Sequence, residues 1–324
     1  MLFQKWCVAA ALLCVTVTVA VAVTAQSEFP AWAYPLTPQA PKLEMEQGII
    51  QKVPGSDVGL TISQTLDRFS AADWHPSDHP AMPLSVSNGR KPDAWACAYC
   101  HRPTGSGGLE NASLAGLPAD YIVQQVKDIA SGVRNTALPK RVPHISKIPI
   151  SQAVTDDELR AAAAYFSSLK PQQMLIVKEG DMAPKLQQRL FFFSPTDDGA
   201  QEPLGKRIVE YPEDYRRFEL LHDARVKFVA HVPSGSIKKG ELLVRAPGGK
   251  TELACASCHG ANLQGLGNIP SIAGRSPSYI VRQLWDIKQG ARNGAMAVLM
   301  KPIVGALDSN DMLNIAAYLA TLPP

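Results

Sequence analysis

Two cysteines and a histidine stand near the C-terminus in the order Cys-x-x-Cys-His, as Cys255, Cys258 and His259. Two thiols at this spacing can form thioether bonds to the two vinyl groups of one porphyrin, and the adjacent histidine can then bind the iron. A redox dithiol does not need the histidine, and a zinc site needs further ligands. The motif therefore predicts a covalently attached c-type haem with His259 as the proximal iron ligand.

The same motif occurs a second time, as Cys97, Cys100 and His101. Residues 97–135 align with residues 255–293 without a gap and share 17 identities in 39 positions. Self-similarity of this kind favours an internal duplication. The sequence therefore predicts two covalently bound c-type haems, each with one iron, and His101 as the second proximal ligand.

Helices must hold each motif so that its histidine faces one haem. In the second unit a helix is expected between Pro277, which suits a first turn, and Gly290, which suits a helix end. The apolar residues of this segment recur at helical spacing and form one stripe: Tyr279, Ile280, Leu284 and Ile287. The first unit repeats the stripe at the aligned positions. The pattern predicts one amphipathic helix after each motif, facing a core that includes a haem edge.

A further helix closes each unit, and each begins with the sequence of a capping box. Thr155 precedes Glu158 by three residues, and Asp308 precedes Asp311 by three, which is the spacing of reciprocal side-chain to backbone caps. Both helices then carry Ala-Ala-Tyr, where small residues let two helices approach closely. We expect each unit to follow the order helix, motif, loop, helix, ligand loop, helix.

The second face of each iron needs its own ligand, because methionine raises the reduction potential, histidine lowers it and an open position permits chemistry. In the second unit, Met300 lies just before Pro302 on the loop that precedes the capped helix. We predict that Met300 is the sixth ligand of the second iron. Met296 is the next choice, and a core-filling methionine is the structural alternative.

The first unit has no methionine in the corresponding loop. Alignment by the capping boxes places Lys147 where the second unit has Met300, and His144 lies three residues earlier. We predict His144 as the ligand, because a lysine must first lose its proton before it can bind iron. Lys147, an open position and a ligand from the N-terminal stretch remain as alternatives. His75 and His79 in that stretch are expected to be ordinary loop residues.

The N-terminus has the pattern of an exported protein. Lys5 precedes an apolar run that ends in Val-Thr-Ala at Ala25, a small-residue cleavage site. We predict a signal peptide over residues 1–25, cleavage near Ala25 and a periplasmic location; a retained membrane anchor is the alternative. Two of the six cysteines fall in this segment and the other four in the haem motifs, so no disulfide framework remains.

The composition and the remaining segments complete the domain plan. The chain of 324 residues has a formal charge of +3 and an ordinary globular composition, with no basic patch that would indicate nucleic acid. We predict a proline-rich, extended arm over residues 26–86, haem units over 87–170 and 239–324, and a linker with short strands over 171–238. Extended runs at 207–211 and 226–232 are the reason for the strands, and His222 and His231 are expected to be structural.

These residues resemble the class I dihaem c-type cytochromes of the cytochrome c4 and c553 type. The resemblance covers about half of the chain and is clearest in the second unit, in Cys255-x-x-Cys258-His259, Pro270-x-Ile272-Ala273-Gly274, Tyr279, Gln283-Leu284, Gly290-x-Arg292, Met300 and Ala316-Ala317-Tyr318. It implies a mainly α fold with two cytochrome c domains in tandem. It also implies that the Pro270 carbonyl orients the proximal histidine and that Arg292 approaches a haem propionate. The first unit keeps Arg134 at the position of Arg292 and has Ala112 at that of Pro270.

The predicted function is that of a periplasmic electron carrier. It would accept single electrons from a dehydrogenase or quinol-oxidising complex and pass them to a terminal oxidase or reductase, so redox proteins, including a membrane-bound complex, are the expected partners. The sequence offers no nucleotide-binding loop or nucleophile motif. Two alternatives remain: a dihaem cytochrome c peroxidase-like enzyme, because the first unit lacks the methionine, and the cytochrome subunit of a larger dehydrogenase.

Overall fold

The computed structural model describes residues 28–35, 48–189, 192–245 and 253–324. The predicted signal peptide over residues 1–25 therefore lies outside the described residues. Within the described ranges, no helix combines the length and the apolar character needed to cross a membrane.

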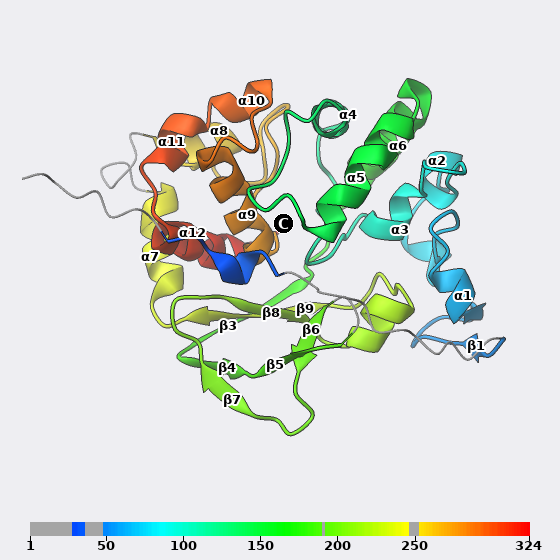
Figure 1. Ribbon diagram of the computed structural model, residues 1–324, viewed down its shortest axis with the longest axis horizontal. Helices are drawn as coiled ribbons and strands as arrows, with labels where there is room; N and C mark the ends of the chain where they lie inside the picture. The colour runs from blue at the N-terminus through cyan, green and yellow to red at the C-terminus, as the bar shows by residue number, and fades with distance from the viewer. Residues whose placement is uncertain (1–27, 36–47, 190–191, 246–252) are drawn as a thin grey trace, which may run out of the picture.

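Two helical units lie side by side, and a strand-containing segment lies along one side of both (Figure 1). The first unit contains α2 (Leu84–Ser87), α3 (Cys97–His101), α4 (Ala119–Ala130), α5 (Val142–Ala153) and α6 (Asp156–Ser168). The second contains α7 (Ser236–Arg245), α8 (Ala256–His259), α9 (Pro277–Lys288), α10 (Ala295–Val298), α11 (Lys301–Gly305) and α12 (Ser309–Thr321). The predicted tandem of mainly α units is confirmed.

Local signals in the sequence set the helix ends. Ser276 caps α9, where its side chain accepts from the Tyr279 N–H, and both predicted capping boxes form at the starts of α6 and α12. One difference concerns the segment before α6, which was expected to be a loop. In the first unit this segment is the single helix α5. The corresponding segment of the second unit, before α12, forms two short helices, α10 and α11. Gly294 is the N-cap residue of α10, whereas residues 142–153, which form α5, contain no glycine.

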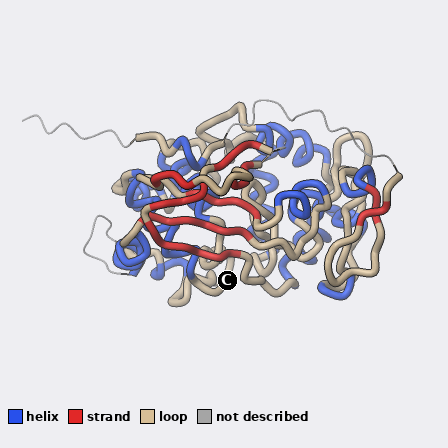
Figure 2. The backbone as a smooth tube through the Cα atoms, turned by 90° about the horizontal axis from the view of Figure 1, so that it is seen from below, coloured by secondary structure: helices blue, strands red, loops and turns tan. Residues whose placement is uncertain are grey.

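The linker forms strands at both runs that predicted them, and also at further segments that were not singled out from the sequence. β9 (Phe228–Pro233) lies at the centre of a three-stranded sheet, parallel to β3 (Leu175–Gly180) and antiparallel to β8 (Val209–Pro212). Two separate two-stranded antiparallel sheets lie in the same segment: β4 (Met182–Pro184) with β7 (Gln201–Pro203), and β5 (Leu186–Gln188) with β6 (Phe193–Pro195). Seen from below, these strands extend across the helices (Figure 2). A π-helical turn (Arg216–Leu220) joins β8 to β9.

The N-terminal stretch is folded and not an extended arm. Residues 31–33 form one 3-10 turn, and a second follows at Pro76–Asp78. Between them lie the strand pair β1 (Ile50–Gln51) and β2 (Leu60–Thr61) and the short helix α1 (Ile62–Thr65). The sequence of this stretch has no regular apolar periodicity, so its buried apolar residues could not be recognised from the pattern. Trp74, for example, is only 2% exposed and packs with Leu220 and Leu221 of the linker. Such residues bury enough surface to fold a segment rich in proline.

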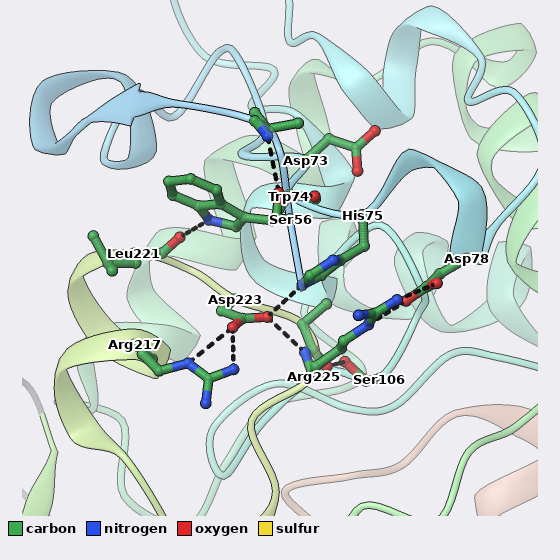
Figure 3. Close-up of polar contacts among 12 residues, drawn as sticks. Ser56, Asp73, Trp74, His75, Asp78, Ser106, Arg217, Leu221, Asp223 and Arg225 are labelled. Atoms are coloured by element: carbon green, nitrogen blue, oxygen red, sulfur yellow. Dashed lines mark hydrogen bonds and ion pairs between the residues drawn. The ribbon is translucent and has the colours of Figure 1, made fainter. Parts of the chain in front are cut away.

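Polar contacts fix the same stretch to the linker (Figure 3). The buried Asp223 carboxylate accepts from the Arg217 guanidinium, with Nε at 3.0 Å, and from the backbone N–H of Arg225 at 3.0 Å. His75 Nε2 lies 3.4 Å from Asp223 Oδ1. Nearby, Arg225 makes a two-point ion pair with Asp78, both distances being 2.7 Å. Residues 53–78 and the linker thus form one packed body beside the first unit, whereas Tyr34 lies against the second unit and donates to Asp286 of α9 at 2.8 Å.

In the second unit, α7 crosses α12 at very close range because of a glycine. A Cβ at Gly240 would overlap the backbone carbonyl of Asn314. We expect Gly240→Ala to destabilise the protein by about 1–3 kcal/mol, because the two helix backbones must separate. Denaturant unfolding of the holoprotein measures this. Gly180→Ala is the matched control, since open space surrounds Gly180; equal losses in the two variants would contradict the close-crossing account.

Candidate haem-binding sites

The second motif opens into an apolar cleft that suits a porphyrin. α8 supplies Cys258 and His259, with Cys255 at its N-cap, and Met296 and Met300 lie among the residues of the same cleft. The cleft holds about 1500 Å³ of space not filled by protein, including the part open to solvent. Leucine and isoleucine side chains line much of the remaining wall of this cleft. These residues would hold a flat apolar group that is joined to the two cysteines.

Each proximal histidine is oriented by a backbone carbonyl. His259 Nδ1 lies 2.8 Å from the Pro270 carbonyl oxygen, and His101 Nδ1 lies 2.8 Å from that of Ala112. Since a carbonyl only accepts, each Nδ1 carries the proton, and each Nε2 has a free lone pair that can bind a metal. The proline missing from the first unit is therefore not needed for this contact, because the acceptor is a main-chain atom.

The electrostatics of the clefts favour neutral imidazoles. Burial lowers the pKa of His259, and burial together with the Lys147 charge lowers the pKa of His101 to about 4. Burial also raises the pKa of Cys97 to about 12 and that of Cys255 to about 11. Both clefts thus disfavour charge on their histidine and sulfur atoms, which suits imidazole ligation and uncharged thioethers.

The first cleft contains Lys147, and His144 lies in a different cavity. Lys147 lines the cleft together with Cys97, Cys100 and His101. His144 does not line this cleft; it lies with Lys147 in an adjoining cavity, where His144 Nε2 is buried without a hydrogen-bond partner. Desolvation lowers the pKa of Lys147 to about 8 and also lowers that of His144. The assignment of His144 as a ligand stays a prediction, and its position does not favour it.

The two clefts meet at an interface to which each unit contributes an arginine, a glutamine and a tyrosine from equivalent positions of the repeat. Arg134 donates to Gln125 Oε1 at 2.8 Å and reaches across to Gln283 Oε1 at 3.1 Å. Arg292 repeats the pattern, donating to Gln283 Oε1 at 3.0 Å and to Gln125 Oε1 at 2.9 Å. Each arginine also donates to the tyrosine of the other unit, Tyr279 or Tyr121.

Sequence reasoning identified the two arginines of this interface; it named Gln283 only as part of the family resemblance and assigned a role to neither glutamine. The usable signal was identity between the repeats, because Gln125 and Gln283 occupy aligned positions. Arg134 and Arg292 each line the cleft of their own unit, and Arg292 Nε is a buried donor without a partner. A buried, unpartnered donor at the cleft wall fits the predicted contact with an anionic propionate.

A testable consequence concerns Gln125, whose single oxygen accepts from both arginines. Gln125→Ala is expected to destabilise the protein by about 1.5–3 kcal/mol, the range for a lost hydrogen bond to a charged group. Thermal unfolding of the holoprotein followed by circular dichroism checks this. The control is Gln172→Ala, at an exposed glutamine, which should change stability by less than about 0.5 kcal/mol. A similar, small effect of both variants would argue against a shared acceptor.

The linker packs on the first motif, whereas one cysteine of the second motif is exposed among the described residues. The Tyr99 ring lies 4.7 Å from the His222 ring, and Arg102 donates to the Phe218 carbonyl at 2.9 Å. In contrast, Cys258 is exposed. Exposed apolar side chains occur in both units: Leu266 and Leu299 of the second are 64% and 67% exposed, and Leu84 and Ile145 of the first are 79% and 52% exposed.

The other histidines lie away from the two clefts. His79 Nε2 lies 3.1 Å from Asp73, and His231 Nε2 lies 3.3 Å from the Tyr211 hydroxyl. Neither they nor His75 and His222 line a haem cleft. Among the described residues, no group of three or more His, Cys, Asp or Glu side chains is placed to hold a separate metal ion.

The fold and the two sites define a protein with two covalently bound haems, one in each of two tandem domains. The profile of the cytochrome c family matches residues 86–170 and 246–323, so the chain belongs to that family. The matched ranges lie close to the predicted haem units. It is a dihaem class I cytochrome c and an electron carrier, similar to cytochrome c4.

Several known proteins align with this chain over most of its length. The chain is 28% identical over 238 residues to a thiosulfate dehydrogenase electron acceptor of Thiomonas intermedia, covering 72% of this chain and 81% of that protein. It is 26% identical over 251 residues to cytochrome c4 of Azotobacter vinelandii, covering 75% and 91%. A solved thiosulfate dehydrogenase from Marichromatium purpuratum is 25% identical, with a TM-score of 0.46 over 71% of this chain and 37% of that one.

Proposed function

We propose that this dihaem cytochrome works in the periplasm and carries single electrons from a dehydrogenase to a terminal oxidase or reductase. The observation that carries the proposal is the wall shared by the two haem clefts. Tyr121, Gln125 and Tyr279 line both clefts. Two redox groups separated by one layer of side chains can exchange electrons within the molecule, so a carrier needs no further chemistry from the chain.

The surroundings of the two motifs differ, and the difference supports a proposal about which haem exchanges electrons with partner proteins. Cys258 and the apolar side chains Leu266 and Leu299 of the second unit face solvent, whereas the linker packs on Tyr99 and Arg102 of the first motif. Exposed apolar surface at a redox centre favours contact with protein partners. We therefore place exchange with partner proteins at the second haem, and the first haem then acts as the inner member of the pair.

The names of two relatives support a substrate-oxidising enzyme as the electron donor. Proteins of Thiomonas intermedia and Stutzerimonas stutzeri are described as thiosulfate dehydrogenase electron acceptors, at 28% and 24% identity. We propose the same class of donor for this chain. Cell fractionation tests the location: haem-bearing chain found only in the cytoplasm would contradict the periplasmic assignment.

A direct reduction assay tests the donor. The oxidised holoprotein is mixed with purified thiosulfate dehydrogenase, and the haem absorption bands are followed after thiosulfate is added. Reduction of both haems, with none when the enzyme is omitted, is expected. No reduction in the presence of active enzyme would contradict this donor. A variant with Leu299→Asp should slow reduction, because it places charge in the exposed apolar surface, while leaving the haem content unchanged.

The missing methionine of the first unit favours one competing function, a peroxidase-like reaction at an accessible iron. Mixing the reduced protein with hydrogen peroxide separates the two functions. Slow, non-catalytic oxidation is expected of a carrier. Rapid oxidation with many turnovers would contradict a purely electron-carrying role.

A further inference from the structure

We propose that the Lys147 amine is the sixth ligand of the first haem iron, an inference that rests on the proposed two-haem carrier. The nitrogen would bind through its lone pair, with the ammonium proton released to solvent. The protein would then supply two nitrogen ligands to the iron of the first unit, and one nitrogen and one sulfur ligand to the iron of the second.

The register of the repeat is the first argument. Lys147 lies eight residues before the capping residue Thr155, and Met300 lies eight before Asp308. Both helices that follow begin with a complete capping box. In addition, a proline follows two residues after each position, as Pro149 and Pro302 in the respective units. Lys147 is thus the positional counterpart of Met300, although one lies within a helix and the other between two.

The orientation of α5 is the second argument. Its residues that line the first haem cleft follow the helical repeat, as Lys147, Ile150, Ser151 and Val154. This face begins at Lys147. His144 lies one turn earlier and lines only the adjoining cavity, whereas Lys147 lines both that cavity and the haem cleft.

The surroundings of the amine are the third argument. Among the described residues, Lys147 makes no hydrogen bond and no ion pair, although its charge acts on both Cys100 and His101. A cation that lines an apolar cleft without a partner is costly. Coordination to iron, opposite His101, would give the nitrogen a partner and remove the charge.

The proposal is tested on the oxidised holoprotein with four variants. Low-temperature electron paramagnetic resonance should show two low-spin haems in the wild type. Lys147→Ala is expected to lose one low-spin signal, with a high-spin signal in its place. Lys147→Met is expected to add a second sulfur-to-iron absorption band in the near infrared. His144→Ala and Lys140→Ala should leave both low-spin signals unchanged, since His144 lies outside the cleft and Lys140 is an exposed lysine of the same region.

The possible results separate the two hypotheses. Unchanged low-spin signals in Lys147→Ala, or loss of a signal in His144→Ala, would overturn the assignment of Lys147. If Lys147→Ala does not retain its haem, the Lys147→Met spectrum decides: no added near-infrared band would overturn the assignment. Fewer than two haems per chain in the wild type, measured as the pyridine haemochrome, would instead contradict the two-haem carrier itself.

Discussion

Replacing Met300 with alanine is expected to abolish a sulfur-to-iron absorption band in the near infrared and to lower the reduction potential of the second haem. Met300 lies in the same cleft as His259 and the two cysteines. A methionine ligand raises the potential of a haem iron. We expect a decrease of about 0.1 V or more, within the roughly 0.8 V that axial ligands span. Spectroelectrochemical titration of the holoprotein measures both changes.

Met296→Ala is the matched control for this prediction, because Met296 is the second methionine of the same cleft and its side chain is 52% exposed. It should leave the band and the potential nearly unchanged. An unchanged band in Met300→Ala would remove Met300 from the ligand set. Loss of the band in Met296→Ala alone would assign the sulfur to Met296.

Replacing Asp223 with alanine is expected to cause the largest loss of stability among the substitutions considered. The carboxylate is 1% exposed and is shared by Arg217, the Arg225 backbone and His75. Removing one partner from a buried charge cluster costs about 3–5 kcal/mol, because the remaining charge keeps its desolvation penalty. That is a large part of the 5–15 kcal/mol by which a typical domain is stable. Denaturant unfolding followed by far-ultraviolet circular dichroism gives the change.

The neighbouring ion pair supplies the control. Asp78 pairs with Arg225 at the surface, where the guanidinium lowers the pKa of the Asp78 carboxyl. Asp78→Asn should cost about 1 kcal/mol or less, as exposed ion pairs do. Comparable losses for Asp78→Asn and Asp223→Ala would show that burial does not set the energy of this cluster.

The Asp223 cluster also bears on function, because the same turn packs on the first haem motif. His222 contacts Tyr99, and Phe218 accepts from Arg102. Loosening the linker should therefore expose the first haem more than the second. Spectra of Asp223→Ala recorded below its unfolding transition should show changes confined to the first haem; equal changes at both haems would contradict this arrangement.

The sequence by itself determined the cofactor, the duplication, and the helices that follow each motif and close each unit. Attachment of haem depends on the order of five adjacent residues, and helix ends depend on caps within three residues, as at Thr155 and Asp308. Such signals are local in the chain, so they can be recognised without the fold. The carbonyl that orients each proximal histidine lies only eleven residues away, at Pro270 and Ala112.

Only the tertiary structure decided which side chain of α5 enters the first cleft, how the N-terminal stretch packs and how the units meet. Lys147 and His144 are three residues apart; both line the adjoining cavity, but only Lys147 also lines the first haem cleft. Trp74 is anchored by a carbonyl 147 residues away. Arg134 and Gln283 are 149 residues apart. Contacts of this range depend on how whole elements pack together, and no local pattern of residues specifies that packing.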